Sequence, residues 1–299
     1  MKIRDVLLLL LLAAIWGSSF IFIRIGVAAL GSLLLADLRV LLAAIVLLIV
    51  VIFSRQKLGL RARWRQYAII GLFNAALPYT LIAFAELRLS ASFGAILNAT
   101  TPLFTALVAT IWLREAFTFR MIGGFILGII GVGVLVGWNP QPLTTIIIIS
   151  IVASLAGAFF YGVGSVYAKR TFQGVPPLHL NIGQQLGAGV ILLPFAVTTL
   201  PSQLPDTTAI IAVLALAILC TAFAYLIYFR LVTTVGPTNT TMVTLLVPIF
   251  GVIWGNLFLH ETVAISTIIG MVIILASVLF LTNISFGTRS VKTVEVAQN

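Results

Sequence analysis

Long runs of apolar residues follow one another along almost the whole chain, without the polar residue at every second position that is typical of membrane barrel strands. A bilayer core of roughly 30 Å needs about 20 apolar residues per helix. Charged residues, prolines and polar clusters between the runs mark the boundaries of ten predicted transmembrane helices. Their ranges are 6–28, 36–54, 67–87, 92–112, 120–138, 145–168, 179–200, 208–231, 238–259 and 265–283. The pattern predicts an all-α integral membrane protein.

Composition supports a membrane protein, because 61% of the 299 residues are hydrophobic and 8% are charged, with a mean hydropathy of +1.22. The connections between the predicted helices are short, and residues 286–299 are expected to form a polar cytoplasmic tail. The first 15 residues have the charge and apolar core of a signal peptide, but the apolar run continues towards Leu30. A retained first helix is therefore the favoured interpretation.

Basic residues are distributed unevenly between the two predicted sides of the membrane. With the N-terminus in the cytoplasm, the outer loops contain only Arg88, and Arg24 and Arg39 lie inside span ends. The cytoplasmic ends and loops contain Lys2, Arg4, Arg55, Lys57, Arg61, Arg63, Arg65, Arg114, Arg120, Lys169, Arg170, Arg230, Arg289 and Lys292. This bias predicts an even number of spans with both termini cytoplasmic. The net charge of +10 therefore indicates membrane topology and not a nucleic-acid partner.

Two segments of the chain repeat the same spacing of uncommon residues. PLFTALVATIWLRE runs from Pro102 to Glu115, and PIFGVIWGNLFLHE runs from Pro248 to Glu261, with a shift of 146 residues. The same shift pairs Tyr79 with Tyr225. The chain is therefore predicted to contain two five-helix repeats, residues 1–144 and 145–285. Because five is odd, the second repeat enters the membrane from the opposite side, an inverted arrangement that is typical of carriers with alternating access.

Residues within the repeated segments have candidate mechanical roles. Pro78, Pro102 and Pro248 are predicted hinges, since proline removes a helical hydrogen bond, although a static kink is the alternative. Glu115 and Glu261 are expected to mark the ends of spans and to cap the next helix, with a coupling role as the alternative.

These motifs resemble a known family. WGSSF in the first span, the two Pro-to-Glu segments and the glycine-rich span after each are similar to the EamA-type module of the drug/metabolite transporter superfamily, and most to its YddG-like bacterial amino-acid exporters. The resemblance implies a ten-helix secondary transporter of the inner membrane. It also implies a central cavity lined by the first, third, fourth, sixth, eighth and ninth spans. The second repeat has YGVGS where the first has WGSSF, so the two cavity walls differ.

Helical spacing and polarity select the candidate substrate-binding residues. They are Trp16, Ser19, Phe20, Asn74, Tyr79, Asn98, Thr101, Tyr161, Ser165, Tyr225 and Thr244. For each threonine taken alone, a hydrogen bond to a carbonyl one turn earlier is the alternative role, and for the aromatic residues it is core packing. Arg24 is a candidate for contact with a substrate carboxylate or for a gate, with a snorkelling end charge as the alternative.

No carboxylate is expected near the midplane, because all seven lie at span ends or outside the spans: Asp5, Asp37, Glu86, Glu115, Asp206, Glu261 and Glu295. This pattern predicts transport without an evident coupling ion, and a neutral, zwitterionic or lipophilic solute. The glycine-rich fifth span, GGFILGIIGVGVLVG, is expected to pack inside a monomer, with a homodimer face as the alternative.

The favoured function is alternating-access export of neutral amino acids or related small metabolites, with export of lipophilic drug cations as the closest alternative. A passive channel would need a continuous polar lining, and a lipid-modifying enzyme would need catalytic groups inside the bilayer. One cysteine, Cys220, and two histidines, His179 and His260, are too few for a convincing metal site, and no cofactor or ATP-binding motif is predicted.

Overall fold

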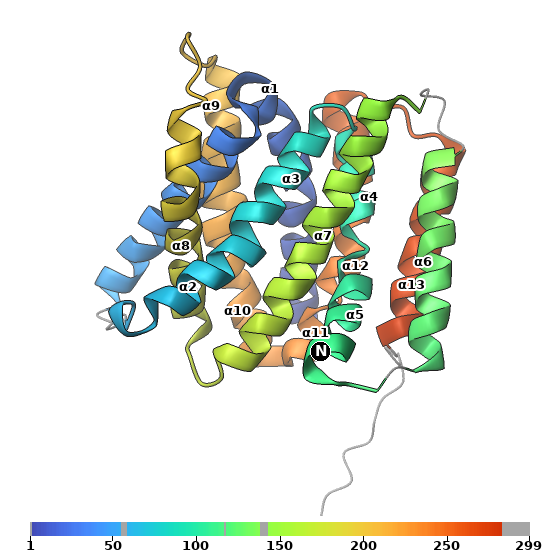
Figure 1. The fold of residues 1–299 in the computed structure, drawn as a ribbon, viewed down its shortest axis with the longest axis horizontal. Helices are drawn as coiled ribbons and strands as arrows, with labels where there is room; N and C mark the ends of the chain where they lie inside the picture. The colour runs from blue at the N-terminus through green and yellow to red at the C-terminus, as the bar shows by residue number, and fades with distance from the viewer. Residues whose placement is uncertain (1, 55–58, 117, 138–142, 283–299) are drawn as a thin grey trace, which may run out of the picture.

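The computed structural model describes residues 2–54, 59–116, 118–137 and 143–282, and these form helices joined by short connections, without a strand (Figure 1). The predicted tail, residues 286–299, lies outside the described residues, as do Arg55, Lys57, Arg289 and Lys292. The all-helical fold class that the apolar pattern predicts is confirmed.

The first helix, α1 (Ile3–Phe53), has 51 residues, which would span about 76 Å if it were straight. It turns at Gly31, whose φ of 71° and ψ of 171° are not helical. Glycine adopts a positive φ readily because it has no Cβ. The chain therefore rises from the N-terminus and then descends along a second path (Figure 1). The predicted spans 6–28 and 36–54 lie on either side of this turn.

The other elements follow in sequence order. They are η1 (Arg61–Arg63), α2 (Trp64–Gly71), η2 (Leu72–Ala76), α3 (Leu77–Glu86), α4 (Ala91–Asn98), α5 (Thr101–Leu113), α6 (Phe119–Gly137), α7 (Thr145–Thr171), α8 (Pro177–Val197), α9 (Thr207–Leu214), η3 (Ala215–Phe223), α10 (Ala224–Val235), α11 (Pro237–Thr240), α12 (Val243–Leu259) and α13 (Ile265–Thr282). Among the described residues, seven helical stretches are long and apolar enough to cross a membrane, and α12 and α13 are shorter apolar helices.

Two of these stretches contain a wide π-helical segment. Leu72–Ala76 lies between α2 and α3, and Ala215–Phe223 lies between α9 and α10. Adding 146 to the first range gives 218–222, which falls inside the second. The repeat in the sequence therefore extends to a local irregularity of the backbone, and such irregularities often occur at functional positions.

The helices that contain the repeated Pro-to-Glu segments are interrupted differently. Residues 99 and 100 separate α4 from α5, whereas residues 241 and 242 separate α11 from α12. Pro102 thus lies in the first turn of α5 and Pro78 in the first turn of α3, while Pro248 lies inside α12. The interruption at residues 99 and 100 lies just before Pro102, which has no N–H for a helical hydrogen bond, so this stretch is broken next to the position where a kink was predicted.

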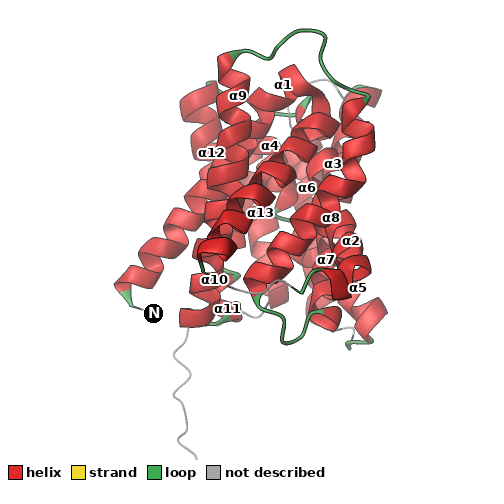
Figure 2. Cartoon of the chain, turned by 90° about the vertical axis from the view of Figure 1, so that its left-hand side faces the viewer, coloured by secondary structure: helices red, strands yellow, loops and turns green. Residues whose placement is uncertain are grey.

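Close contacts hold α1 in the centre of the helix bundle. A Cβ atom on Gly17 would lie 2.6 Å from Cβ of Phe250 and 3.0 Å from the carbonyl oxygen of Val247, so α1 and α12 touch through their backbones. The α1 helix also packs on α3, α8 and η3. The α6 and α13 helices pair at one side of the molecule, where Gly131 faces Ile274 (Figures 1 and 2).

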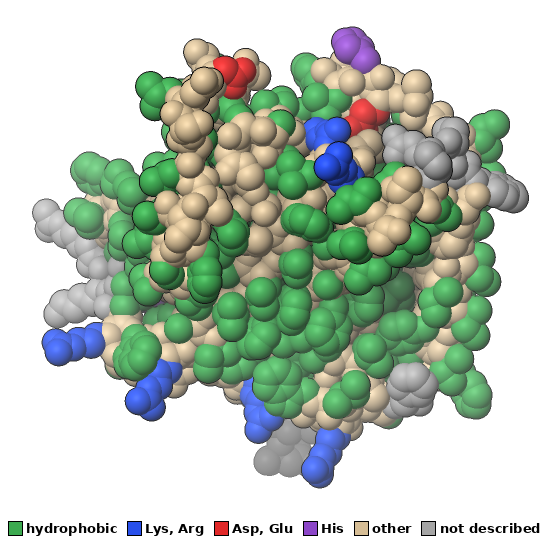
Figure 3. All heavy atoms as spheres, turned by 45° about the horizontal axis from the view of Figure 1, so that its top comes forward, with side chains coloured by type: hydrophobic (Ala, Val, Ile, Leu, Met, Phe, Trp, Pro, Cys, Tyr) green, Lys and Arg blue, Asp and Glu red, His purple; other side chains and the backbone are tan. Residues whose placement is uncertain are grey.

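The molecule is mainly hydrophobic around its sides, and Lys and Arg side chains gather along its lower edge (Figure 3). Exposed basic residues include Arg4, Arg63, Arg114, Lys169 and Arg230. The apolar sides are typical of a surface that faces lipid.

Candidate functional site

Arg39, in the second half of α1, is a charged residue inside the helix bundle. Its side chain is 8% exposed. Its Nε donates a hydrogen bond to Oγ1 of Thr221 (3.0 Å), and its Cζ lies 3.8 Å from the centre of the Tyr79 ring. The two terminal amino groups make no hydrogen bond with the described residues, so they are available to another acceptor.

Tyrosine rings from three stretches of the chain lie near this guanidinium, which interacts electrostatically with Tyr79, Tyr161 and Tyr225. The Tyr79 and Tyr161 rings meet edge to face at 6.2 Å. Trp16 packs against Tyr225 at 5.9 Å and against Tyr228 at 5.6 Å. The rings offer flat apolar faces beside one positive charge, and cation–π contact stabilises that charge.

Side-chain amides form a third part of the cluster. Asn74 Nδ2 donates to Gln184 Oε1 (2.9 Å), and Gln184 Nε2 donates to Asn181 Oδ1 (3.0 Å). Tyr225 lies beside Gln184, which connects the amides to the aromatic rings. Both polar atoms of the neighbouring Gln185 are buried without a partner among the described residues. We call Arg39, Asn74, Tyr79, Tyr161, Gln184 and Tyr225 the Arg39 cluster.

The structure brings several of the sequence-predicted residues to this cluster. Asn74, Tyr79, Tyr161 and Tyr225 belong to it, and Trp16 packs on its edge. Phe20 is buried 3.5 Å from the position of a Cβ on Gly94, close to the Glu86 side chain.

The predicted hydroxyl and amide residues outside the cluster make local hydrogen bonds. Ser19 and Thr101 donate to carbonyls three residues earlier, and Thr244 donates to the carbonyl of Thr241. Asn98 contacts the Thr101 hydroxyl, and Ser165 is exposed. For Thr101 and Thr244, these hydrogen bonds to backbone carbonyls are the alternative role named in the sequence analysis.

Arg24 is tied to a helix end. Its Nη1 donates to the backbone carbonyl oxygen of Glu86, the last residue of α3. A cation at the C-terminus of a helix stabilises the unpaired carbonyls there.

The position of a residue along a predicted span does not show whether its side chain is buried, and two carboxyl groups and one guanidinium illustrate this. Asp37, Arg39 and Glu86 all fall near predicted span ends, yet Asp37 is 2% exposed and Glu86 is 0% exposed. Depth along a span therefore did not show that these three side chains are covered by neighbouring helices. The sequence prediction also missed Gln184 and Thr221, because a single amide or hydroxyl does not indicate a binding role until the helices packed against it are known.

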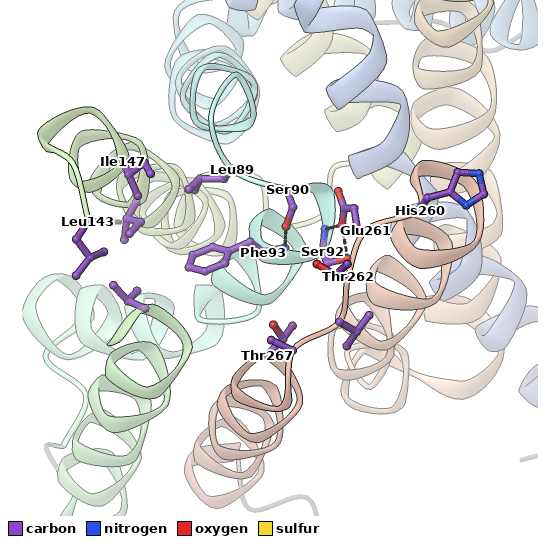
Figure 4. Close-up of a pocket in the computed structure, with 14 residues that line it drawn as sticks. Leu89, Ser90, Ser92, Phe93, Leu143, Ile147, His260, Glu261, Thr262 and Thr267 are labelled. Carbon is purple, nitrogen blue, oxygen red and sulfur yellow. Dashed lines mark hydrogen bonds between the residues drawn. The ribbon is translucent and has the colours of Figure 1, made fainter. Parts of the chain in front are cut away.

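A pocket of about 410 Å³ lies at the end of the molecule opposite the basic edge, between α4, α6, α7 and α13 (Figure 4). Ser90, Ser92, Phe93, His260 and Glu261 contribute to its lining. None of the sequence-predicted substrate-binding residues lines it.

Glu261 joins the two halves of the chain at this pocket. Its carboxylate accepts hydrogen bonds from the backbone N–H groups of Ala91 (2.7 Å) and Ser92 (3.0 Å) and from the Ser92 hydroxyl (2.5 Å). It thus caps the N-terminus of α4, where helix amides favour a negative charge. The prediction that Glu261 caps the helix after it is wrong, because the capped helix lies 170 residues earlier in the chain.

Glu115, the equivalent residue of the first half, has a different partner. Its Oε1 pairs with Lys169 Nζ at 2.9 Å, and the two side chains are 50% and 68% exposed. Among the described residues no group of three or more His, Cys, Asp or Glu side chains is arranged to hold a metal ion.

Apolar sides, a basic edge and a buried cluster of one guanidinium, aromatic rings and amides are the features of a multi-pass membrane protein. The model of the EamA-like transporter family matches this chain twice, over residues 4–137 and 148–283. The chain belongs to that family, and it is a transporter of the inner membrane and not an enzyme.

Relatives cover nearly the whole chain. It is 27% identical over 281 residues to "Uncharacterized transporter YvbV" of Bacillus subtilis, which covers 93% of this chain and 91% of that protein. It is 27% identical over 309 residues to "Probable amino-acid metabolite efflux pump" of Salmonella typhimurium, which covers 99% and 100%. One crystal structure, 18% identical, superposes with a TM-score of 0.64 over 95% of this chain and 98% of its own, a likeness of fold.

Proposed function

We propose that this protein is a secondary carrier that exports neutral amino acids or closely related zwitterionic metabolites, and that the Arg39 cluster binds them. The observation that carries the proposal is the buried Arg39 guanidinium, whose terminal amino groups are unused among the described residues. A guanidinium fork matches the two oxygens of a carboxylate. The rings of Tyr79, Tyr161 and Tyr225 suit an apolar or aromatic substrate side chain.

The same charge argues against the alternative of a lipophilic drug cation. A cation in this cluster would approach Arg39 in a poorly screened interior, where like charges repel. The acidic residue Glu86 interacts electrostatically with Arg39, but its carboxyl group makes no hydrogen bond with the cluster. The name of the Salmonella relative, an amino-acid metabolite efflux pump, also favours a substrate of this class.

We infer further that the chain crosses the membrane ten times as two inverted repeats, 1–144 and 145–285, with both termini in the cytoplasm. The turn at Gly31 divides α1 into two crossings, so the seven long stretches make eight crossings. The shorter helices α12 and α13 add two more, which gives ten. The double match of the family model and the paired π-helical segments support the repeat. Labelling of single cysteines from outside intact cells tests this topology, with Arg88→Cys expected to react and Arg230→Cys expected to be protected.

The repeats would let one end open while the other closes, as alternating access requires. Pro78, Pro102 and Pro248 remain proposed hinges, since Pro78 follows the π-helical segment η2, Pro102 follows the break after α4, and Pro248 lies inside α12.

Counterflow in liposomes tests the substrate and the cluster together. Purified protein is reconstituted with unlabelled phenylalanine, threonine or methionine inside, and uptake of the labelled amino acid is followed. We expect saturable counterflow that falls at least about tenfold in Arg39→Gln, since loss of a charged hydrogen-bond partner costs roughly 1.5–3 kcal/mol. Trp16→Ala should weaken counterflow less, through lost ring packing.

Arg230→Gln is the matched control, because Arg230 is exposed at the basic edge. Counterflow that is unchanged in Arg39→Gln would remove the Arg39 cluster from the proposal. Counterflow of a lipophilic cation and of no amino acid would establish the drug-export alternative.

A further inference from the structure

Glu86 is the most completely buried acidic side chain at the pocket end of the molecule. Its exposed fraction is 0%, and neither carboxyl oxygen has a hydrogen-bond partner among the described residues. Its Oε1 lies 3.2 Å from the position that a Cβ on Gly94 would occupy, and the Phe20 ring is 3.5 Å from the same position. An ionised carboxylate without hydrogen bonds is costly to bury, whereas the neutral acid costs much less.

Few charged groups face Glu86 from the surrounding elements. Arg24 and Arg39 come from α1, and Glu261 comes from the chain after α12, and each interacts with Glu86 electrostatically. The described residues of α4 and of the adjoining part of α7, 145–160, bring no ionisable side chain. The Arg24 Nη1 donates to the backbone carbonyl of Glu86 and not to its carboxyl group.

Glu86 and Glu261 are thus two carboxyl groups with opposite surroundings at one helix terminus. The Glu261 carboxylate accepts three hydrogen bonds from the start of α4, which satisfies its negative charge. A second negative charge on Glu86 would repel Glu261 and oppose the contact between Glu261 and α4.

We propose that Glu86 is a proton-binding site: it carries a proton while Glu261 caps α4, and it releases the proton when this end of the carrier opens. The ligand is a proton, and its binding favours the closed arrangement of this end. Glu261 and Ser92 line the pocket, whereas Glu86 is buried and is not among its lining residues, so proton release requires the contact between Glu261 and α4 to open. The inference rests on the proposed alternating-access function, because it assigns the proton to one of the two conformations.

The test follows the separation of the two segments that Glu261 joins, without any substrate. Spin labels are attached at Leu87→Cys and Thr262→Cys, two exposed positions on either side of the contact, in a Cys220→Ala background. Distances between the labels are measured by pulsed electron paramagnetic resonance in lipid nanodiscs as the buffer is taken from mildly acidic to mildly alkaline. We expect the long-distance population to grow as pH rises, and to lose this dependence in Glu86→Gln, which mimics the protonated acid.

His260→Asn is the matched control, because His260 carries an imidazole and directly precedes Glu261. Asparagine tolerates its left-handed backbone, with φ of 52°. The pH dependence should persist in this variant. A dependence that survives in Glu86→Gln, or distances in the native sequence that do not change with pH, would overturn the proton site.

The readout also separates this inference from the proposed function. A wrong substrate class changes counterflow and leaves the distances unaffected. Saturable amino-acid counterflow combined with pH-independent distances would reject the proton site alone.

Discussion

The two Pro-to-Glu segments share a sequence pattern and a backbone, but their glutamates have different partners. The α5 helix ends at Leu113 and α12 at Leu259, and the next residues, Arg114 and His260, have nearly equal left-handed φ angles of 56° and 52°. Glu261 nevertheless turns inward onto α4, whereas Glu115 pairs with the exposed Lys169. Equivalent sequences therefore support two different contacts in one molecule.

One residue accounts for part of this difference. Gly255 lies opposite Ser92, and a Cβ on it would come within 2.5 Å of both Glu261 Oε2 and Ser92 Oγ. The equivalent residue in the first segment is Ala109. The space that lets Glu261 reach α4 is thus absent from the matching position at the other end.

The difference matters for a carrier, because a molecule with both ends closed or both ends open cannot alternate. Under the proposed function, the Glu261 end is closed by a satisfied helix cap, while Glu115 is held by a weaker surface pair. The structure then corresponds to one of the two states of an alternating-access cycle.

The largest effect is expected for Gly255→Ala. The added methyl group would displace the Glu261 carboxylate and leave the α4 amides and the Ser92 hydroxyl without partners, at roughly 1–3 kcal/mol for each buried group. The midpoint of thermal unfolding in detergent should fall by several degrees. Ala109→Gly at the other end should cost about 1 kcal/mol or less, by helix propensity alone. Equal losses at the two positions would contradict the role given to Gly255.

Glu261→Gln and Glu115→Gln compare the glutamates directly. The first should lower stability by roughly 1.5–3 kcal/mol, because hydrogen bonds to a charged group are lost. The second should change it by about 0–1 kcal/mol, as for exposed ion pairs. The unfolding midpoints of the two variants are measured in the same detergent. A larger loss of stability for Glu115→Gln than for Glu261→Gln would contradict the prediction.

Ser92→Ala removes one of the three donors to Glu261 and leaves the two backbone donors in place. The expected loss of stability is about 1 kcal/mol, less than for Glu261→Gln. The double variant Ser92→Ala with Glu261→Gln should cost less than the sum of the single variants, since both act on one contact. A fully additive result would indicate that Ser92 stabilises α4 by some other contact.

The smallest effects are expected for Arg114→Gly and His260→Gly. Glycine relieves the left-handed conformation but adds entropy to the unfolded chain, so each change should lie within about 1 kcal/mol. The two values should agree, because the backbones are equivalent. Chemical denaturation of both variants checks this, and a clear difference would mean that the side-chain contacts strain one backbone more than the other.

Much of the fold could be predicted from the sequence, because apolar length and the charges between apolar runs reflect the membrane itself. The ends of α5 and α12 at Leu113 and Leu259 fall within one residue of the predicted ends at 112 and 259. The break between α4 and α5 lies just before Pro102, where a kink was predicted, but the division into two separate short helices depends on packing and could not be predicted from hydropathy.

The candidate site was predicted in part. Aromatic residues such as Tyr79 and Tyr225 stand out because the repeat pairs them, and both reach the Arg39 cluster. Arg39 was set aside as a span-end charge, although the turn at Gly31 and the packing of α1 against η3 place it inside the bundle. Depth along one helix cannot reveal which neighbours cover that helix.

The π-helical segment Ala215–Phe223 sets how far α10 is rotated about the helix axis relative to α9. A π-helical turn holds an extra residue, and the backbone N–H of Ala224 accordingly donates to the carbonyl of Leu219, five residues earlier. Deleting one residue there would restore an ordinary α-helix and rotate α10 by about 100° relative to α9. Tyr225 would then leave Trp16, so the number of residues in this turn, as much as their identity, determines which face of the helix meets α1.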